Sequence, residues 1–371
     1  MELLNATQMQ AGYTMGLRPD GRELLVVAIK GTFSFPQRYE PLQLAEKQVP
    51  LIEADTFTGE PGLSAPVYES DYAPHKARCD VILNGSAYAP ENNEVKYIEV
   101  SLQVGACYKT FQVIGDRHWE VSLLSISASS PMPFRTMPIS YDRAFGGVDN
   151  RHADDSKHAA YMLNPVGRGY HQNLDRDLIE YTPLPNTEVI GQRVNKPRGK
   201  YHPMAFGPLG RGWEPRYRLA GTYDQNWLDN TFPFLPADFN EAYYQCAPVD
   251  QQIDYLRGGE EVKLINLTPN GYTTFRLPTL AVPVIFFPKK GEKQEVQAVA
   301  DTLVLEPDAK RLMITWRAHL PLKKNMLEVA QVLVGKKSRG WWRARQLGKT
   351  YYPSLAALAR SKRKPPADED E

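Results

Sequence analysis

Apolar and polar residues alternate with the period of β-strands over much of the first third of the chain. Residues 24–35 form a long β-branched run, and residues 97–104 and 109–114 alternate between apolar and polar positions. Successive side chains of a strand point to opposite faces of a sheet, so this pattern predicts strands that bury one face. Residues 80–83 are also strand-like and stop at the turn dipeptide Asn84-Gly85. Residues 97–104, 109–114 and 118–121, spaced by roughly ten residues, predict an antiparallel meander with one face exposed to water.

Strand patterns return in the last third of the chain. Residues 261–267 and 272–277 are separated by Asn270-Gly271, which predicts a hairpin. Three further segments have the composition of strands: residues 282–287, 298–306 and 311–316. Residues 326–334 fit a strand or a helix, and residues 354–362 predict a short helix with Ser354 as its N-cap.

The middle of the chain, residues 132–259, has neither period over any long stretch. Short aromatic clusters are interrupted there by Gly, Pro, Asn and Asp. A structureless loop of this length is rare inside a compact domain, and the abundance of Trp, Tyr and Phe argues against disorder. We therefore expect an ordered, loop-rich region that packs on the sheets through its own aromatic side chains.

These patterns predict a mainly β fold of antiparallel, sandwich-like sheets with few short helices. No linker interrupts the chain before residue 321. We expect one domain over residues 1–321, with strand-rich flanks at 1–131 and 260–321 around the loop-rich middle at 132–259. Residues 322–371 form a C-terminal extension with a basic tail.

The charge distribution limits the classes of partner. The whole chain has a net charge of +1, but residues 336–364 carry ten of the 44 Lys and Arg residues and no Asp or Glu. The remainder, with 34 basic and 43 acidic residues, has a net charge of −9. A basic tail that contains Trp341 and Trp342 can bind nucleic acid, anionic lipid or an acidic protein. On an otherwise acidic chain we expect no nucleic-acid partner.

Cysteine usage and the N-terminal sequence indicate a compartment. Three cysteines, Cys79, Cys107 and Cys246, have no motif spacing, so we expect small buried side chains and no disulfide or zinc site. The first residues lack the pattern of a signal peptide, and the longest apolar run is too short to span a bilayer. We expect a cytoplasmic protein without membrane insertion.

The sequence carries no standard catalytic signature. It has no phosphate-binding glycine motif, nucleophile elbow or zinc-binding H-E-x-x-H motif. The pair His152 and His158 matches no recognised ligand spacing, so we expect no metal and no cofactor. One enzymatic alternative stays open: Asp142 and Asp224 could supply the two carboxylates of a carbohydrate-active or other hydrolytic enzyme. The structural alternative is that aspartates in turn-like clusters bond their own backbone.

Ordered motifs in the middle region carry a resemblance to a known family. They include residues 141–147 (YDRAFGG), 164–169 (NPVGRG), 206–208 (FGP), 213–216 (WEPR), 221–224 (GTYD) and 247–252 (APVDQQ). Over residues 1–321 the chain resembles a domain-of-unknown-function family that is encoded in bacterial type VI secretion clusters. Members often carry pentapeptide repeats, which this chain lacks.

The resemblance implies a cytoplasmic adaptor or chaperone that binds a secreted effector. Such an adaptor helps to load the effector onto the VgrG-type spike and its PAAR-type tip, without catalysis. A structural component of the secretion apparatus is a further alternative.

Trp, Tyr and Arg carry much of the binding energy at protein interfaces, which makes these side chains of the middle region candidate partner-binding residues. They are Tyr141, Arg143, Phe145, Arg168, Arg211, Trp213, Arg216, Tyr223 and Trp227. The alternative for each arginine is that it ties down carbonyls of its own loop, and Trp213 and Trp227 could belong to the core.

Overall fold

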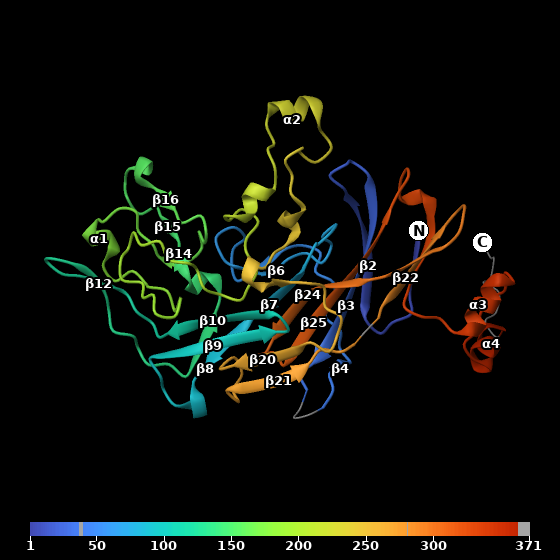
Figure 1. The fold of residues 1–371 in the computed structure, drawn as a ribbon, viewed down its shortest axis with the longest axis horizontal. Helices are drawn as coiled ribbons and strands as arrows, with labels where there is room; N and C mark the ends of the chain where they lie inside the picture. The colour runs from blue at the N-terminus through green and yellow to red at the C-terminus, as the bar shows by residue number, and fades with distance from the viewer. Residues whose placement is uncertain (37–39, 280, 363–371) are drawn as a thin grey trace, which may run out of the picture.

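Strands dominate the structure, as the alternating sequence patterns predict. The computed structural model describes residues 1–36, 40–279 and 281–362 (Figure 1). The acidic end of the predicted tail lies outside the described residues. The described helices are short, namely α1 (Arg176–Ile179), α2 (Gln225–Asn230), α3 (Arg339–Gln346) and α4 (Leu355–Lys362). The mainly β prediction is therefore confirmed.

The apolar run near the N-terminus forms β3 (Glu23–Ser34), which lies between β25 (Arg311–Pro321) and the edge strand β2 (Gln10–Leu17) of a seven-stranded sheet. In the order of the sheet, its other strands are β19 (Gln252–Ile253), β7 (Cys79–Leu83), β24 (Val299–Glu306), β25 and β2, while β4 (Gln43–Leu44) pairs with β3. β25 and β3 pair antiparallel along nearly their full lengths. This sheet thus joins the two strand-rich flanks of the sequence.

The predicted meander is wrong at its third strand. Residues 97–104 and 109–114 pair antiparallel as β9 (Tyr97–Val104) and β10 (Cys107–Ile114), but residues 118–121 contain β11 (Trp119–Val121), which pairs with β12 (Ile126–Ala128). The strand predicted at residues 80–83 is β7, which pairs parallel with β24 and antiparallel with β19. The segment that follows, β8 (Gly85–Tyr88), leaves the sheet to pair with β13 (Thr136–Ile139). All five residues of β7 are buried, as is typical of a strand that is covered on both faces.

The predicted hairpin at residues 261–277 and the first two strands of the meander lie in a five-stranded sheet. Its order is β18 (Thr187–Glu188), β10 (Cys107–Ile114), β9 (Tyr97–Val104), β20 (Glu261–Ile265) and β21 (Tyr272–Arg276). β9 and β10 turn at Gly105, and β20 and β21 turn at Gly271; both glycines have positive φ. A positive φ at a tight turn favours glycine, so these two turns follow directly from the sequence.

A third sheet extends the fold beyond the expected domain boundary. Its order is β1 (Glu2–Asn5), β26 (Val329–Val334), β22 (Pro283–Pro288) and β23 (Gln294–Gln297). β26, the segment that fitted a strand or a helix, pairs parallel with β1 and antiparallel with β22. Val332 and Val334 of this strand are fully buried. The folded domain therefore includes residues beyond 321, because β26 completes a sheet that the N-terminus begins.

Among the described residues, four further small pairs of strands lie outside the large sheets, two of them before the middle region and two within it. They are β5 (Thr56–Phe57) with β6 (Pro66–Tyr68), β11 (Trp119–Val121) with β12 (Ile126–Ala128), β14 (Phe145–Gly146) with β17 (Arg168–Gly169), and β15 (Val148–Asp149) with β16 (Ala159–Ala160). The lobe around β11 to β17 lies at one end of the long axis, and α3 and α4 lie at the other end (Figure 1).

Two hydrophobic clusters hold these parts together. The main core draws side chains from all three large sheets and from the middle region. A second core within the lobe packs Trp119, Phe145, Ile179, Leu184 and Val194. The predicted ordered middle that packs through aromatics is thus present. The three cysteines are free and buried, as expected.

Candidate functional site

A groove of about 510 Å³ opens in the loop-rich middle of the chain. Its lining is mostly apolar and includes Leu163, Pro203, Leu209, Pro215, Leu219, Pro248 and Val249. Polar side chains at its margin include His202, Glu214, Asp250 and Gln252. An apolar hollow of this size with a few polar groups is typical of sites that bind ligands or partner segments, which span roughly 300–1,000 Å³.

Three short 3₁₀ helices build the walls of the groove: η4 (Arg216–Leu219), η5 (Glu241–Tyr244) and η6 (Val249–Gln251). Pro215 and Pro248 directly precede η4 and η6. The fixed φ of proline suits such starts, and the absent N–H costs nothing at the first turn. Asn240 caps η5 by accepting a hydrogen bond from the Ala242 N–H at 2.9 Å.

The chain between η4 and η5 rises from the groove as a projection that carries α2 (Figure 1). Tyr223, Leu228, Phe232 and Phe234 of this projection are all exposed, with Tyr223 at 54% and Phe232 at 61%. The rings of Tyr223 and Phe232 stack edge-on against the half-buried Trp227. Exposed aromatic side chains gathered on one element often mark an interaction surface.

Arg216 ties the groove wall to the rest of the protein. Its guanidinium donates from Nε to the Tyr243 carbonyl at 2.9 Å and from Nη1 to the Leu209 carbonyl at 2.8 Å. Nη2 forms an ion pair with Glu69 at 2.5 Å. The side chain is 3% exposed, so the fork of Arg216 is fully used inside the protein.

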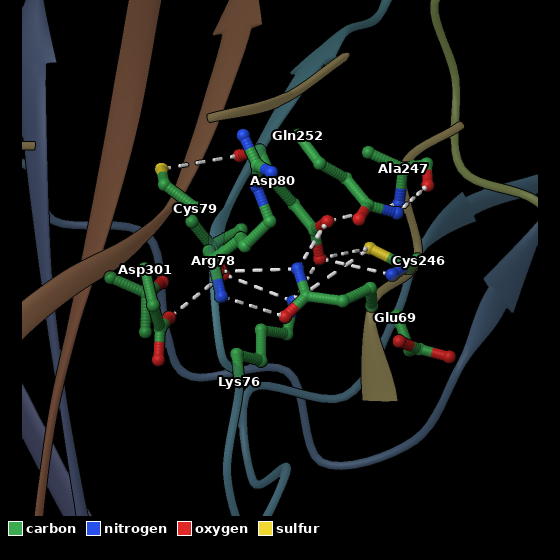
Figure 2. A network of polar contacts seen from close by, with 12 residues as sticks. Glu69, Lys76, Arg78, Cys79, Asp80, Cys246, Ala247, Gln252 and Asp301 are labelled. Carbon is green, nitrogen blue, oxygen red and sulfur yellow. Dashed lines mark hydrogen bonds and ion pairs between the residues drawn. The ribbon is translucent and has the colours of Figure 1, made fainter. Parts of the chain in front are cut away.

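Asp80 holds the segment at residues 246–247, which forms another part of the groove wall (Figure 2). One carboxylate oxygen accepts from the Cys246 N–H at 2.9 Å and the other from the Ala247 N–H at 3.2 Å. The same carboxylate pairs with Lys76, 2.7 Å away, and both side chains are buried. A buried ion pair with additional hydrogen bonds holds its segments in one geometry, so this wall is rigidly attached to β7.

In this network Lys76 stays charged and the Cys246 thiol stays protonated. Burial opposes the charge on Lys76, but the Asp80 carboxylate, with Cys246 and Asp301, raises the pKa of Lys76 above its ordinary value. Burial and the adjacent Asp80 raise the pKa of the Cys246 thiol well above its ordinary value. A protonated, buried thiol is not an activated nucleophile, so the network is structural.

A second ion pair lies at the margin of the groove. The buried ammonium of Lys109 is 3.2 Å from the half-exposed carboxylate of Asp250 and donates to the side-chain oxygen of Gln251 at 2.8 Å. Burial lowers the pKa of Lys109, and Asp250 opposes that effect. Partial burial and the nearby Lys109 lower the pKa of His202, so its ring tends to be neutral at this margin.

The two carboxylates of the enzymatic alternative have structural partners. Asp142 accepts from the Thr58 hydroxyl at 2.7 Å and from the Ala65 N–H at 2.8 Å. Asp224 caps α2 by accepting from the Trp227 N–H at 2.8 Å. Neither residue lines the groove. Both carboxylates therefore serve turns and caps, as the structural alternative expects.

Comparison with known proteins places the chain in a family. A family model described as an uncharacterized protein conserved in bacteria (DUF2169) matches residues 20–317. The chain belongs to this family. No curated protein and no solved structure matches it. The DUF2169 match contains every residue that lines the groove, whereas β1, β26, α3 and α4 lie outside it.

Four of the predicted partner-binding residues are buried in this DUF2169 chain. Tyr141, Phe145, Trp213 and Arg216 are each at most 6% exposed. Tyr141 packs edge-on against Trp213, and Phe145 belongs to the core of the lobe. These side chains stabilise the middle region, and Tyr141 and Arg216 also line the groove.

Three of the predicted arginines are partly buried and bonded within the chain. Arg143 donates to the side-chain oxygen of Asn186 at 3.1 Å, and Arg168 donates to the Asp142 carbonyl at 2.9 Å. Arg211 forms a bidentate pair with Asp55 at 2.7 and 3.2 Å. Among the nine predicted residues, this leaves Tyr223 and Trp227 of the projection as the surface candidates.

The structure also brings together residues that sequence reasoning did not select. Leu163, Leu219, Val249 and Asp250 face the groove from segments far apart in the sequence. A usable signal was present in residues 247–252, whose proline starts the short helix at the margin. Among the described residues, no group of three or more His, Cys, Asp or Glu could hold a metal ion, and no helix is long and apolar enough to cross a membrane.

Proposed function

We propose that this chain is a non-catalytic adaptor that binds a secreted effector in the bacterial cytoplasm and helps to load it onto a type VI secretion spike. The groove is the observation that carries the proposal. It is apolar, large enough to seat several side chains, and has walls that are pinned by buried bonds to Arg216 and Asp80. A preorganised apolar groove loses little entropy when a partner segment enters.

Two further features support a binding role. The projection between η4 and η5 carries the exposed aromatic side chains of Tyr223 and Phe232, which can offer a second contact to a partner. The aspartates of the enzymatic alternative are engaged as turn and cap acceptors. The sequence motifs of the middle region resemble those of the type VI cluster family, and this resemblance supplies the identity of the proposed partners: an effector, a VgrG-type spike and a PAAR-type tip.

The test is a pull-down from the native host with a substitution at the groove margin. Val249 is 77% exposed there, so Val249→Glu should leave the fold intact while placing a charge in the apolar contact. Val148→Glu is the matched control, because Val148 is also exposed and does not line the groove. Mass spectrometry identifies and quantifies the captured proteins.

We expect the wild type and the control to recover a toxin-like protein together with a spike or tip protein. Val249→Glu should reduce that recovery about tenfold, the effect of losing one contact of about 1.4 kcal/mol. Recovery of no such partner from cells that express the secretion system contradicts the adaptor proposal. Unchanged recovery with Val249→Glu would show that the partner binds at a site other than the groove.

A further inference from the structure

A second cavity lies in the lobe at the far end of the five-stranded sheet. It encloses about 280 Å³ between the first residues of β9, the end of β12 and the loop at residues 191–195. Its apolar walls include Tyr97, Ile114, Pro131 and Val194. The remaining lining is polar and comes from Arg117, Ser127, Ser129, Arg193 and Asn195.

Arg117 is the buried charge of this cavity. Its side chain is 4% exposed and pairs with Glu188 at 2.6 Å, while Nη2 also donates to the Pro185 carbonyl at 2.9 Å. Its Nε–H has no hydrogen-bond partner. The Nε atom is itself buried away from solvent, so Arg117 contributes a charged wall to the cavity and not a free donor.

Arg193 adds a second guanidinium at the opening. It is exposed and stands over the ring of Tyr97, 5.8 Å from the ring centre. No carboxylate of the described residues forms a salt bridge with Arg193, and none lines the cavity. Glu188 balances the charge of Arg117, so Arg193 leaves the cavity with a net positive charge.

The cavity wall is held in place through the same ion pair. Glu188 accepts a hydrogen bond from the Val194 N–H at 3.0 Å, which fixes the loop that carries Arg193. Ser129 is fixed too, because its hydroxyl oxygen accepts from the His118 N–H at 3.0 Å. The positive groups therefore surround a preformed hollow.

We propose that this cavity binds a carboxylate that is attached to a compact apolar group, such as the C-terminal residue of a polypeptide. The guanidinium of Arg193 can fork onto the carboxylate, and the apolar walls receive the attached group. The buried Glu188 carboxylate beside Arg117 disfavours a doubly charged phosphate. This proposal does not depend on the adaptor function.

The test is calorimetric titration of the full chain with N-acetylleucine at low salt. N-acetylleucinamide, which has the same apolar group without the charge, and inorganic phosphate are the comparison ligands. Arg193→Gln removes the exposed guanidinium, and Lys196→Gln is the matched control because Lys196 is an exposed cation three residues away that does not line the cavity.

We expect N-acetylleucine to bind and the amide not to bind. Arg193→Gln should weaken binding about tenfold or more, as expected for the loss of a charge-assisted hydrogen bond, and Lys196→Gln should leave it unchanged. Equal binding of acid and amide, tight binding of phosphate in place of the acid, or equal loss in both variants would overturn the proposal. Absence of acid binding at millimolar concentration overturns it as well.

Discussion

Several charged side chains in this protein are buried in pairs rather than displayed on the surface. In the seven-stranded sheet and the segments around it, Lys30 pairs with Asp71, Lys76 with Asp80 and Arg317 with Asp301. Each carboxylate also accepts hydrogen bonds from neighbouring segments, and Asp80 alone accepts from residues 246 and 247. Since such groups are costly to bury without partners, each network requires one arrangement of distant segments.

Removal of one member of the Asp80 network should be more damaging than removal of both. Asp80→Ala leaves the buried Lys76 ammonium and two backbone N–H groups unpaired, and we expect a loss of about 3–5 kcal/mol in the free energy of unfolding. The double replacement Lys76→Met with Asp80→Leu should recover part of that loss. Urea denaturation measures all variants.

Asp154→Ala is the control for this comparison. Asp154 is an exposed N-cap of a short 3₁₀ helix. Its replacement should lower the free energy of unfolding by about 1 kcal/mol or less. A loss for Asp80→Ala no larger than that of the control would show that the network does not anchor the groove wall.

At the scale of elements, α3 is attached to the third sheet through cationic and aromatic side chains. The Trp342 ring lies near Phe287 of β22, and the Lys293 ammonium is 4.4 Å from the Trp342 ring centre. The Arg345 guanidinium stands 3.9 Å from the centre of the Phe287 ring. Trp342 and Arg345 of the basic tail are thus both in contact with the third sheet.

Trp342→Ala should detach α3 without unfolding the sheets. Stacking and cation–π contacts of a partly exposed ring are worth about 1–2 kcal/mol, enough to free a short helix. We expect faster trypsin cleavage at Arg343 and Arg345, detected by mass spectrometry, with an almost unchanged melting temperature. Leu355→Ala in the exposed part of α4 should cleave like the wild type, and an identical pattern for Trp342→Ala would contradict the proposed attachment.

At the scale of the whole molecule, the N-terminal strand β1 and the late strand β26 meet in one sheet. β1 from the N-terminus and β22 flank β26, whose residues Val332, Leu333 and Val334 are fully buried. The sheet therefore depends on a strand that lies beyond both the DUF2169 match and the boundary expected from the sequence.

Two truncations separate the domain from its tail. A chain ending at Gly335 keeps β26 and should remain soluble, with a melting temperature close to that of the full chain. A chain ending at Leu322 removes β26 and leaves the edges of β1 and β22 unpaired, so we expect aggregation. Soluble yield, size-exclusion profile and circular dichroism melting distinguish the two, and a stable monomer that ends at Leu322 would return the boundary to residue 321.

Much of the secondary structure was readable from the sequence, but the pairing of strands was only partly so. The prediction for β9 at residues 97–104 coincides with the strand, and Asn270-Gly271 does join β20 to β21. The strand at β7 was predicted but its partner was not, because β24 lies more than two hundred residues later in the chain. Residue patterns record a local period and local turns, and they do not record which distant strand completes a sheet.

The candidate site shows the same division. The region was predicted correctly, since every groove residue lies within residues 132–259. The residues predicted within it included large Arg and Trp side chains such as Arg216 and Trp213. Those side chains are buried because they satisfy the carbonyls and fill the core of a region that has few regular backbone bonds.

The sequence by itself determined the mainly β class, the hairpin turns and the ordered, aromatic-rich middle, because strand period and turn chemistry are properties of neighbouring residues. Only the tertiary structure decided which side chains face the groove and which serve the core. The position of these side chains depends on contacts such as that of Asp80 with Cys246, which lie 166 residues apart in the sequence. Such a contact contributes to stability only after the distant segments have come together.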